Sequence, residues 1–151
     1  MAHPEPAPID VPDFIADGVT ALLSEGFVQQ RQYFDGGAFG VWQLELANEP
    51  LRVEVARDRF AWEVTAGWRT EGTPRLEWYN IEAWMECLRE LDTLVSMTLE
   101  EQMEYVCQTW RSMKEALAPE RLESTRACLS ERQIVRSRAV LGDPNLGKDR
   151  Y

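Results

Sequence analysis

The sequence predicts an α+β fold: a leading helix, then an antiparallel meander of about five strands, then about three helices that pack on one face of the sheet. Two patterns support this prediction. Between Leu51 and Trp68, apolar and polar residues alternate with a period of two, as in strands that bury one face. After Asn80 the apolar residues recur every three or four positions, as on one face of a helix. An isolated hairpin is only marginally stable in water, so further strands and covering helices are expected.

The leading helix is expected to run from Val11 to Glu25, where the apolar residues share one helical face. Asp10 is a suitable N-cap, and Pro12 suits the first turn because its fixed φ matches the helix. Gly26 is expected to end this helix.

Five strands follow in the prediction, and short turns separate them. Asp35-Gly36-Gly37 is a strong hairpin signal, because glycine tolerates positive φ. Asn48-Glu49-Pro50 turns the chain into the alternating segment. Such short connections favour an antiparallel meander over a parallel sheet. The strands are expected at residues 27–34, 38–46, 51–56, 60–68 and 74–79.

Three helices are expected after the sheet. The first spans Ile81–Val95, with Asn80 as its cap. The second begins at Thr98-Leu99-Glu100-Glu101, which has the form of a capping box. The third begins near Pro119 and ends before Gly142, and its C-terminal half is rich in arginine.

The second of these helices carries a narrow apolar seam between Leu99 and Leu117, with steps of four and three residues. A seam of this kind joins helices either within one chain or between two copies. It is too short for the sustained heptads of a free coiled coil, so intramolecular core is the preferred interpretation. A homodimer through Leu99–Leu117 is the alternative.

The length of 151 residues suits a single domain with one core. We expect residues 1–10 to form a Pro-rich flexible lead, residues 11–141 to form the domain, and residues 142–151 to form a loose tail. No apolar run approaches the roughly 20 residues of a membrane span. The first residues lack the basic and apolar regions of a secretory signal, so a cytoplasmic location is expected.

Charge is the strongest global signal, with a net of −10 from 26 acidic and 16 basic residues. Residues 1–117 carry 21 acidic and 9 basic residues, a net of −12, whereas residues 118–151 carry 5 and 7, a net of +2. An acidic body repels nucleic acid and anionic lipid, so neither is expected as a partner. The charge favours a basic protein partner, although it is also ordinary for a protein kept in solution by its net charge.

No catalytic constellation is recognisable in the sequence. The only histidine, His3, lies in the flexible lead, which excludes a catalytic triad or a zinc site built on an ordered histidine. Cys87, Cys107 and Cys128 form no C-x-x-C pair, and we expect all three to be reduced structural thiols. The protein is therefore expected to be non-catalytic and to use no cofactor and no metal.

Carboxylates recur at helical i, i+4 spacing in Glu82/Glu86/Glu90 and in Glu100/Glu104. Such a row can bind a divalent ion, but no Asp-rich loop or E-x-x-H pattern accompanies it. We therefore interpret both rows as solvated helix faces.

Five residues are candidates for contacts with a partner. Arg57-Asp58-Arg59 is expected to form a corner between two strands, in which Asp58 acts as a turn former. The functional alternative is that this corner is an exposed docking element. Trp68 and Tyr79 fall at strand ends, where one exposed aromatic side chain would be able to anchor a partner.

The stretch LRVEVARDRFAWEV from Leu51 to Val64, followed by Trp78-Tyr79, resembles small bacterial immunity-type proteins of polymorphic toxin systems. Several such families share a leading helix, a strand pattern ending in an Arg-Asp-Arg corner, an aromatic-rich return strand and later helices. The resemblance covers residues 11–95. It implies a cytosolic antitoxin that binds a cognate toxin domain and blocks it without catalysis. An acidic body would suit a basic toxin through electrostatic steering.

Three functions are compatible with these observations. The preferred one is a protein-binding module, most concretely an immunity-like inhibitor. The second is a structural or regulatory homo-oligomer that uses the Leu99–Leu117 seam. The third is a small-ligand-binding protein or an enzyme with a pocket between the sheet and the helices, which has the least support because no catalytic constellation is present.

Overall fold

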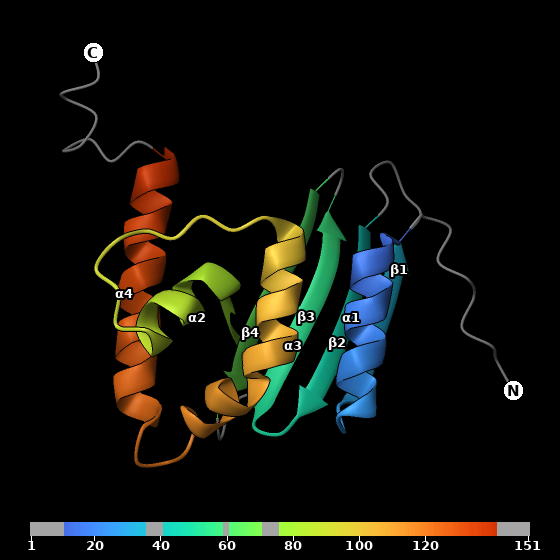
Figure 1. Ribbon diagram of the computed structural model, residues 1–151, viewed down its shortest axis with the longest axis horizontal. Helices are drawn as coiled ribbons and strands as arrows, with labels where there is room; N and C mark the ends of the chain where they lie inside the picture. The colour runs from blue at the N-terminus through green and yellow to red at the C-terminus, as the bar shows by residue number, and fades with distance from the viewer. Residues whose placement is uncertain (1–10, 36–40, 59–60, 71–75, 142–151) are drawn as a thin grey trace, which may run out of the picture.

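The computed structural model has the predicted α+β architecture, with an N-terminal helix, a five-stranded antiparallel sheet and three further helices (Figure 1). It describes residues 11–35, 41–58, 61–70 and 76–141, so the expected lead, tail and Gly36-Gly37 corner lie outside the described residues. The elements are α1 (Asp13–Ser24), β1 (Val28–Asp35), β2 (Val41–Asn48), β3 (Leu51–Asp58), β4 (Ala61–Arg69), β5 (Leu76–Asn80), α2 (Ile81–Leu88), α3 (Leu99–Glu115) and α4 (Leu122–Leu141).

The sheet is the predicted meander, with the strand order β1-β2-β3-β4-β5 and antiparallel neighbours throughout. The predicted turn at Asn48-Glu49-Pro50 joins β2 to β3. Between β3 and β4, Val53 lies opposite Ala66 and Val55 lies opposite Val64. This register places the apolar residues of both strands on one face, as the alternation requires.

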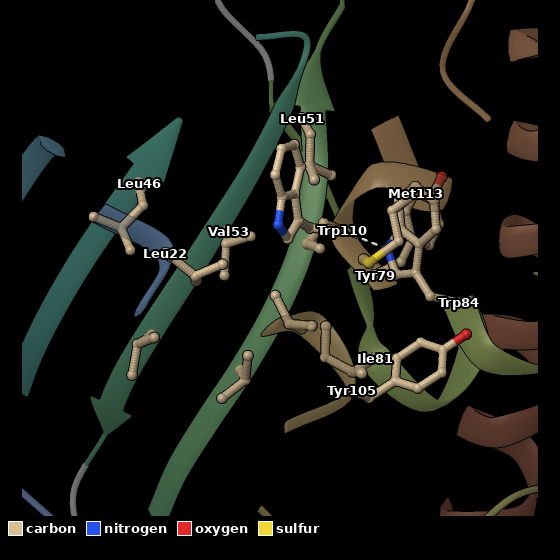
Figure 2. Close-up of a cluster of buried hydrophobic side chains, with 14 of the residues drawn as sticks. Leu22, Leu46, Leu51, Val53, Tyr79, Ile81, Trp84, Tyr105, Trp110 and Met113 are labelled. Carbon is tan, nitrogen blue, oxygen red and sulfur yellow. Dashed lines mark hydrogen bonds between the residues drawn. The ribbon is translucent and has the colours of Figure 1, made fainter. Parts of the chain in front are cut away.

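The helices cover that apolar face of the sheet, and in Figure 1 they lie in front of the strands. Figure 2 shows part of the resulting core, in which Val53 and Leu51 of the sheet face the same interior as Trp110 and Met113 of α3. Trp84 of α2 donates from Nε1 to the backbone oxygen of Ala66 at 2.9 Å. The buried strand residues on this face are Trp42, Leu44, Leu46, Leu51, Val53, Val55, Val64, Ala66, Trp68 and Tyr79.

α1 lies where the sequence predicts it and packs against α3. Ile15 and Leu22 of α1 are completely buried, because they sit on its apolar face. Pro12 occupies the N-cap position without a side-chain cap, and Asp10 is outside the described residues. Gly26 follows the helix with a φ of 101°, which only glycine adopts readily, so its role as a helix stop is confirmed.

α3 begins with the predicted capping box. The backbone N–H of Glu101 donates to the Thr98 hydroxyl at 3.1 Å, and the backbone N–H of Thr98 donates to the Glu101 carboxylate at 3.0 Å. The seam along this helix is buried inside the chain, with Met113 completely inaccessible. The burial of the seam from Met103 to Leu117 confirms the preferred interpretation as intramolecular core, and a homodimer through Leu99–Leu117 stays a prediction.

α2 is shorter than predicted, since it ends at Leu88 and not at Val95. Glu90 adopts a φ of 53°, and the backbone N–H of Leu91 donates to the carbonyl oxygen of Glu86 at 2.8 Å, which closes the helix end. The apolar spacing that continues past this point therefore lies on a connection and not on a helix. Asn80 precedes α2 as expected but makes no side-chain cap hydrogen bond.

The connection after α2 is held by the carboxylates of α2 itself. The backbone N–H of Val95 donates to Glu86 at 2.7 Å, and that of Met97 donates to Glu82 at 2.9 Å. These hydrogen bonds satisfy backbone donors that a helix would otherwise have paired. They therefore hold this non-helical segment against α2.

Two arginines of α4 complete this carboxylate cluster. Arg132 Nε lies 2.7 Å from Glu86, and Arg136 contacts both Glu86 and, at 2.8 Å, Glu82. The Glu86 side chain has no exposed surface. The interpretation of Glu82 and Glu86 as a solvated row is therefore wrong. Removing one partner of such a buried pair typically costs about 3–5 kcal/mol, because it strands the other charge.

α4 begins at Leu122 and not at Pro119. The expectation of three reduced thiols is wrong as well, because Cys87 of α2 and Cys128 of α4 form a disulfide. Cys107 is the free cysteine among the described residues and is half-buried. Burial raises the pKa of the Cys107 thiol, so it stays protonated near neutral pH.

We expect Gly67→Ala to destabilise the protein by about 3 kcal/mol. A Cβ at this position would overlap the backbone carbonyl of Glu77 in β5, which cannot move without breaking the β4–β5 ladder. Gly18→Ala in α1 is the matched control, since the atoms nearest to its Cβ belong to the flexible side chain of Met103 and not to backbone. That control should cost less than about 1 kcal/mol, because alanine also favours the helix. Urea unfolding measures both, and equal midpoints for the two variants would contradict this packing.

Reducing the Cys87–Cys128 disulfide should lower the free energy of unfolding by about 4 kcal/mol, since it closes a loop with a sequence separation of 41 residues. The double variant Cys87→Ser/Cys128→Ser should show the same loss without reductant. Urea unfolding with and without a phosphine reductant measures the effect. The reductant should leave the double variant unchanged, and Cys107→Ser should retain the full response. An unaltered wild-type midpoint under complete reduction would refute the prediction.

Candidate functional site

The Arg57-Asp58-Arg59 segment does not form a corner over its whole length. Arg57 and Asp58 are the last residues of β3 and pair with Trp62 and Ala61 of β4. Arg59 lies outside the described residues. Arg57 is half-buried. The described part of this segment is thus strand, and its role in binding stays a prediction.

Trp68 and Tyr79 are both part of the core, with exposed fractions of only 3% and 8%. Their rings stack with centroids 5.6 Å apart, and the Tyr79 hydroxyl lies 3.1 Å from the hydroxyl of Ser130 in α4. Burial raises the pKa of Tyr79. The expectation that one of them remains exposed as an anchor is wrong, because both strand ends lie beneath helices.

The opposite face of the sheet is covered by none of the described helices, and we call it the open face. The described helices lie on the side of the apolar face (Figure 1). α4 stands beyond the edge strand β5, and it too contacts residues of that face, Glu77 and Tyr79. The register of the strands shows which residues lie on the open face. It includes Val28 and Arg31 of β1, Gln43, Glu45 and Ala47 of β2, Arg52, Glu54 and Ala56 of β3, Glu63, Thr65 and Gly67 of β4, and Trp78 of β5.

Three glutamates form an acidic row across the centre of the open face. Glu45 and Glu54 are direct cross-strand partners, and Glu63 lies diagonally from Glu54 on the next strand. Like charges in these positions destabilise a sheet. Burial raises the pKa of Glu54, and the charges of Glu45 and Glu63 raise it further, while Arg31 acts in the opposite direction.

One end of the acidic row is neutralised within the protein. Arg52 Nη1 donates to Glu45 at 2.8 Å, and the same guanidinium also contacts Glu49 in the β2–β3 turn. Glu45 and Arg52 are nearly buried, with exposed fractions of 7% and 9%. Within the part of the chain that the structure describes, no ion pair holds Glu54. The unbalanced charge of the row therefore lies at Glu54 and Glu63.

The open face also carries a partly exposed aromatic side chain. Trp78 is half-buried and stands opposite Gly67, which in turn pairs with Arg52, so the three form one line across β5, β4 and β3. Gly67 allows the close approach of the two strands, since a Cβ there would overlap the β5 backbone. A partly exposed indole on the same face as the acidic row is suited to the aliphatic stems and charged heads of lysine or arginine.

Other kinds of site have less support in the described residues. No group of three or more His, Cys, Asp or Glu side chains there is arranged to hold a metal ion. The glutamates of α2 instead receive guanidinium and backbone N–H donors. None of the described helices has both the length and the apolar character needed to cross a membrane.

Comparison with known proteins adds no assignment: no family model matches the chain, and neither a curated protein nor a solved structure matches it significantly. The geometry of the open face is therefore the main indication of function.

Sequence reasoning did not select Glu45, Glu54, Glu63 or Trp78 as candidates. The alternation of Arg52 and Glu54 with Val53 and Val55 does identify a polar face. It does not reveal that carboxylates from three strands meet there, because cross-strand register depends on the exact turn lengths. A search for glutamates on the polar face of every predicted strand would have found the row without its geometry.

Glu54→Gln should stabilise the protein at pH 7 by about 0.5 kcal/mol, a small value because solvent partly screens the row. The pKa of Glu54 is raised in the folded state, so the ionised form disfavours folding above that pKa. Below the unfolded-state pKa, both states are protonated and the gain should disappear. Urea unfolding at pH 7 and pH 3.5 tests this, with Glu100→Gln on the exposed start of α3 as control. A loss of stability at pH 7 would contradict repulsion at Glu54.

Proposed function

We propose that this protein is a non-catalytic binding module that receives a basic protein partner on its open face, most concretely as an immunity-like inhibitor of a cognate toxin domain. The observation that carries the proposal is the acidic row, in which Glu54 is partly buried among like charges and has no balancing ion pair in the described chain. The repulsion among these carboxylates lowers the stability of the free protein, and a cation that approaches them reduces the repulsion.

The charge of the whole chain supports the same class of partner. A net charge of −10 creates a field that accelerates association with basic proteins and repels nucleic acid and anionic lipid. Glu63 at the exposed edge of the row suits this steering role, whereas the partly buried Glu54 suits a contact that is desolvated in the complex. Trp78 on the same face supplies apolar area for an anchor.

Inhibition without catalysis is the mode of action that we propose. The single histidine of the chain is His3, and no nucleophile–base pair is evident in the sequence. A homo-oligomer through the Leu99–Leu117 seam has less support, because the seam is filled by the chain's own core. A binding module needs no catalytic group, and the negative charge of the open face supports a basic partner.

The compartment in which the partner is met is part of the proposal. The resemblance to immunity-type proteins implies the cytoplasm as the place where the partner is met. The Cys87–Cys128 disulfide favours an oxidising compartment, because reducing compartments rarely retain structural disulfides. Trapping thiols with an alkylating agent in intact cells distinguishes the two, since only an oxidising compartment would leave Cys87 and Cys128 unmodified.

The proposal predicts a stable complex with a basic protein encoded beside this one. Co-expression of the two should give a co-purifying complex and should relieve the growth defect caused by the neighbour alone. Glu45→Gln/Glu54→Gln/Glu63→Gln should weaken binding at least tenfold, mainly through slower association at low salt. Surface plasmon resonance at several salt concentrations measures this effect.

A second triple variant controls for total charge. Glu100→Gln/Glu104→Gln/Glu120→Gln removes the same three charges from exposed positions on α3 and the connection that follows it, on the helical side. It should change the affinity less than threefold. If both triple variants weaken binding equally, net charge and not the open face accounts for the association. If no basic neighbouring product binds, the immunity-like role is rejected.

A further inference from the structure

A second feature, on the helical side of the molecule, is a cleft of about 340 Å³. Three of its residues, Tyr105, Thr109 and Ser112, are spaced i, i+4 and i+7 on α3, so they share one helix face. Arg89 directly follows α2, and Arg121 directly precedes α4. The remaining lining residues are Leu88 and Glu115.

The two arginines of this cleft differ from most other described arginines. Arg52, Arg111, Arg126, Arg132 and Arg136 each form an ion pair with a glutamate. Within the described chain, Arg89 and Arg121 have no carboxylate within ion-pair distance. Glu115 is the single acidic residue of the lining, so the cleft carries a net positive charge on a strongly acidic protein.

The hydroxyl groups between the arginines add neutral donors. The guanidinium carbon of Arg89 lies 5.8 Å from the ring centroid of Tyr105, which orients this long side chain over the cleft. Ser112 is exposed further along α3. The cleft is thus lined by two guanidiniums and three hydroxyl groups, so it is rich in hydrogen-bond donors.

We propose that this cleft binds a small tetrahedral oxyanion, the phosphate group of a small molecule or free phosphate. Guanidinium forks match the geometry of phosphate oxygens, and hydroxyl donors complete the coordination of the remaining oxygens. The volume lies at the lower end of ligand pockets, about 300–1,000 Å³, which suits a ligand with few heavy atoms. The ligand would link α2, α3 and the start of α4.

This site is independent of the open face, because α2 and α3 cover the opposite side of the sheet. Failure of one proposal therefore leaves the other intact.

Isothermal titration calorimetry with inorganic phosphate, at constant ionic strength set with chloride, tests the proposal. We expect saturable binding that Arg89→Gln and Arg121→Gln each weaken at least tenfold. Arg69→Gln is the matched control, since Arg69 is exposed at the end of β4 and away from this cleft. Glu115→Gln should tighten binding about threefold, because it removes the one negative charge of the lining. Circular dichroism confirms that each variant is folded.

A parallel titration with glycerol phosphate identifies the source of the anion. Tighter binding of the monoester indicates a phosphorylated small molecule, and equal affinity indicates free phosphate; both support the site. The proposal is overturned if phosphate gives no heat beyond that of chloride up to 20 millimolar. It is also overturned if Arg69→Gln weakens binding as much as the two cleft variants, since binding would then follow overall charge.

Discussion

The structure depends on one constraint, which is that the described helices cover only one face of the five-stranded sheet. Val53, Val55 and Val64 are essentially inaccessible, and they share a face with Trp42 and Ala66. Burying such side chains contributes about 1.5–3 kcal/mol each, so the helices have one favourable side on which to pack. The same alternation places glutamates on the other face. Core and candidate binding surface are therefore two consequences of a single period-two pattern.

The last helix is held by polar contacts more than by apolar ones. Its sequence has no clear apolar stripe, yet Arg132 and Arg136 reach the buried Glu86 of α2, and Cys128 is bonded to Cys87. A buried carboxylate is costly to desolvate, and full pairing with two guanidiniums and a backbone N–H offsets that cost. Such a network requires a specific geometry, so it fixes the register of α4 on α2 more sharply than apolar contact would.

The sequence was sufficient for features that depend on local periodicity or on capping. The order of elements, the stop at Gly26 and the Thr98 capping box all follow from neighbouring residues. Features that depend on distant residues were missed. The i, i+4 spacing of Glu86 is also that of carboxylates on a solvated helix face. Only the position of α4 shows that arginines pair with Glu86. For the same reason, a strand-end position did not reveal that Trp68 is covered by helices.

The acidic row links the stability of this fold to its proposed role. A sheet selected for stability alone would place a lysine or a threonine opposite Glu45, since either avoids the repulsion between Glu45 and Glu54. The same protein neutralises its other partly buried carboxylates, Glu77 with Arg126 and Glu86 with two arginines. The chain pairs these carboxylates but leaves Glu54 without an ion pair in its described part. Under the proposed function, the repulsion at Glu54 is a local cost that a cationic partner removes.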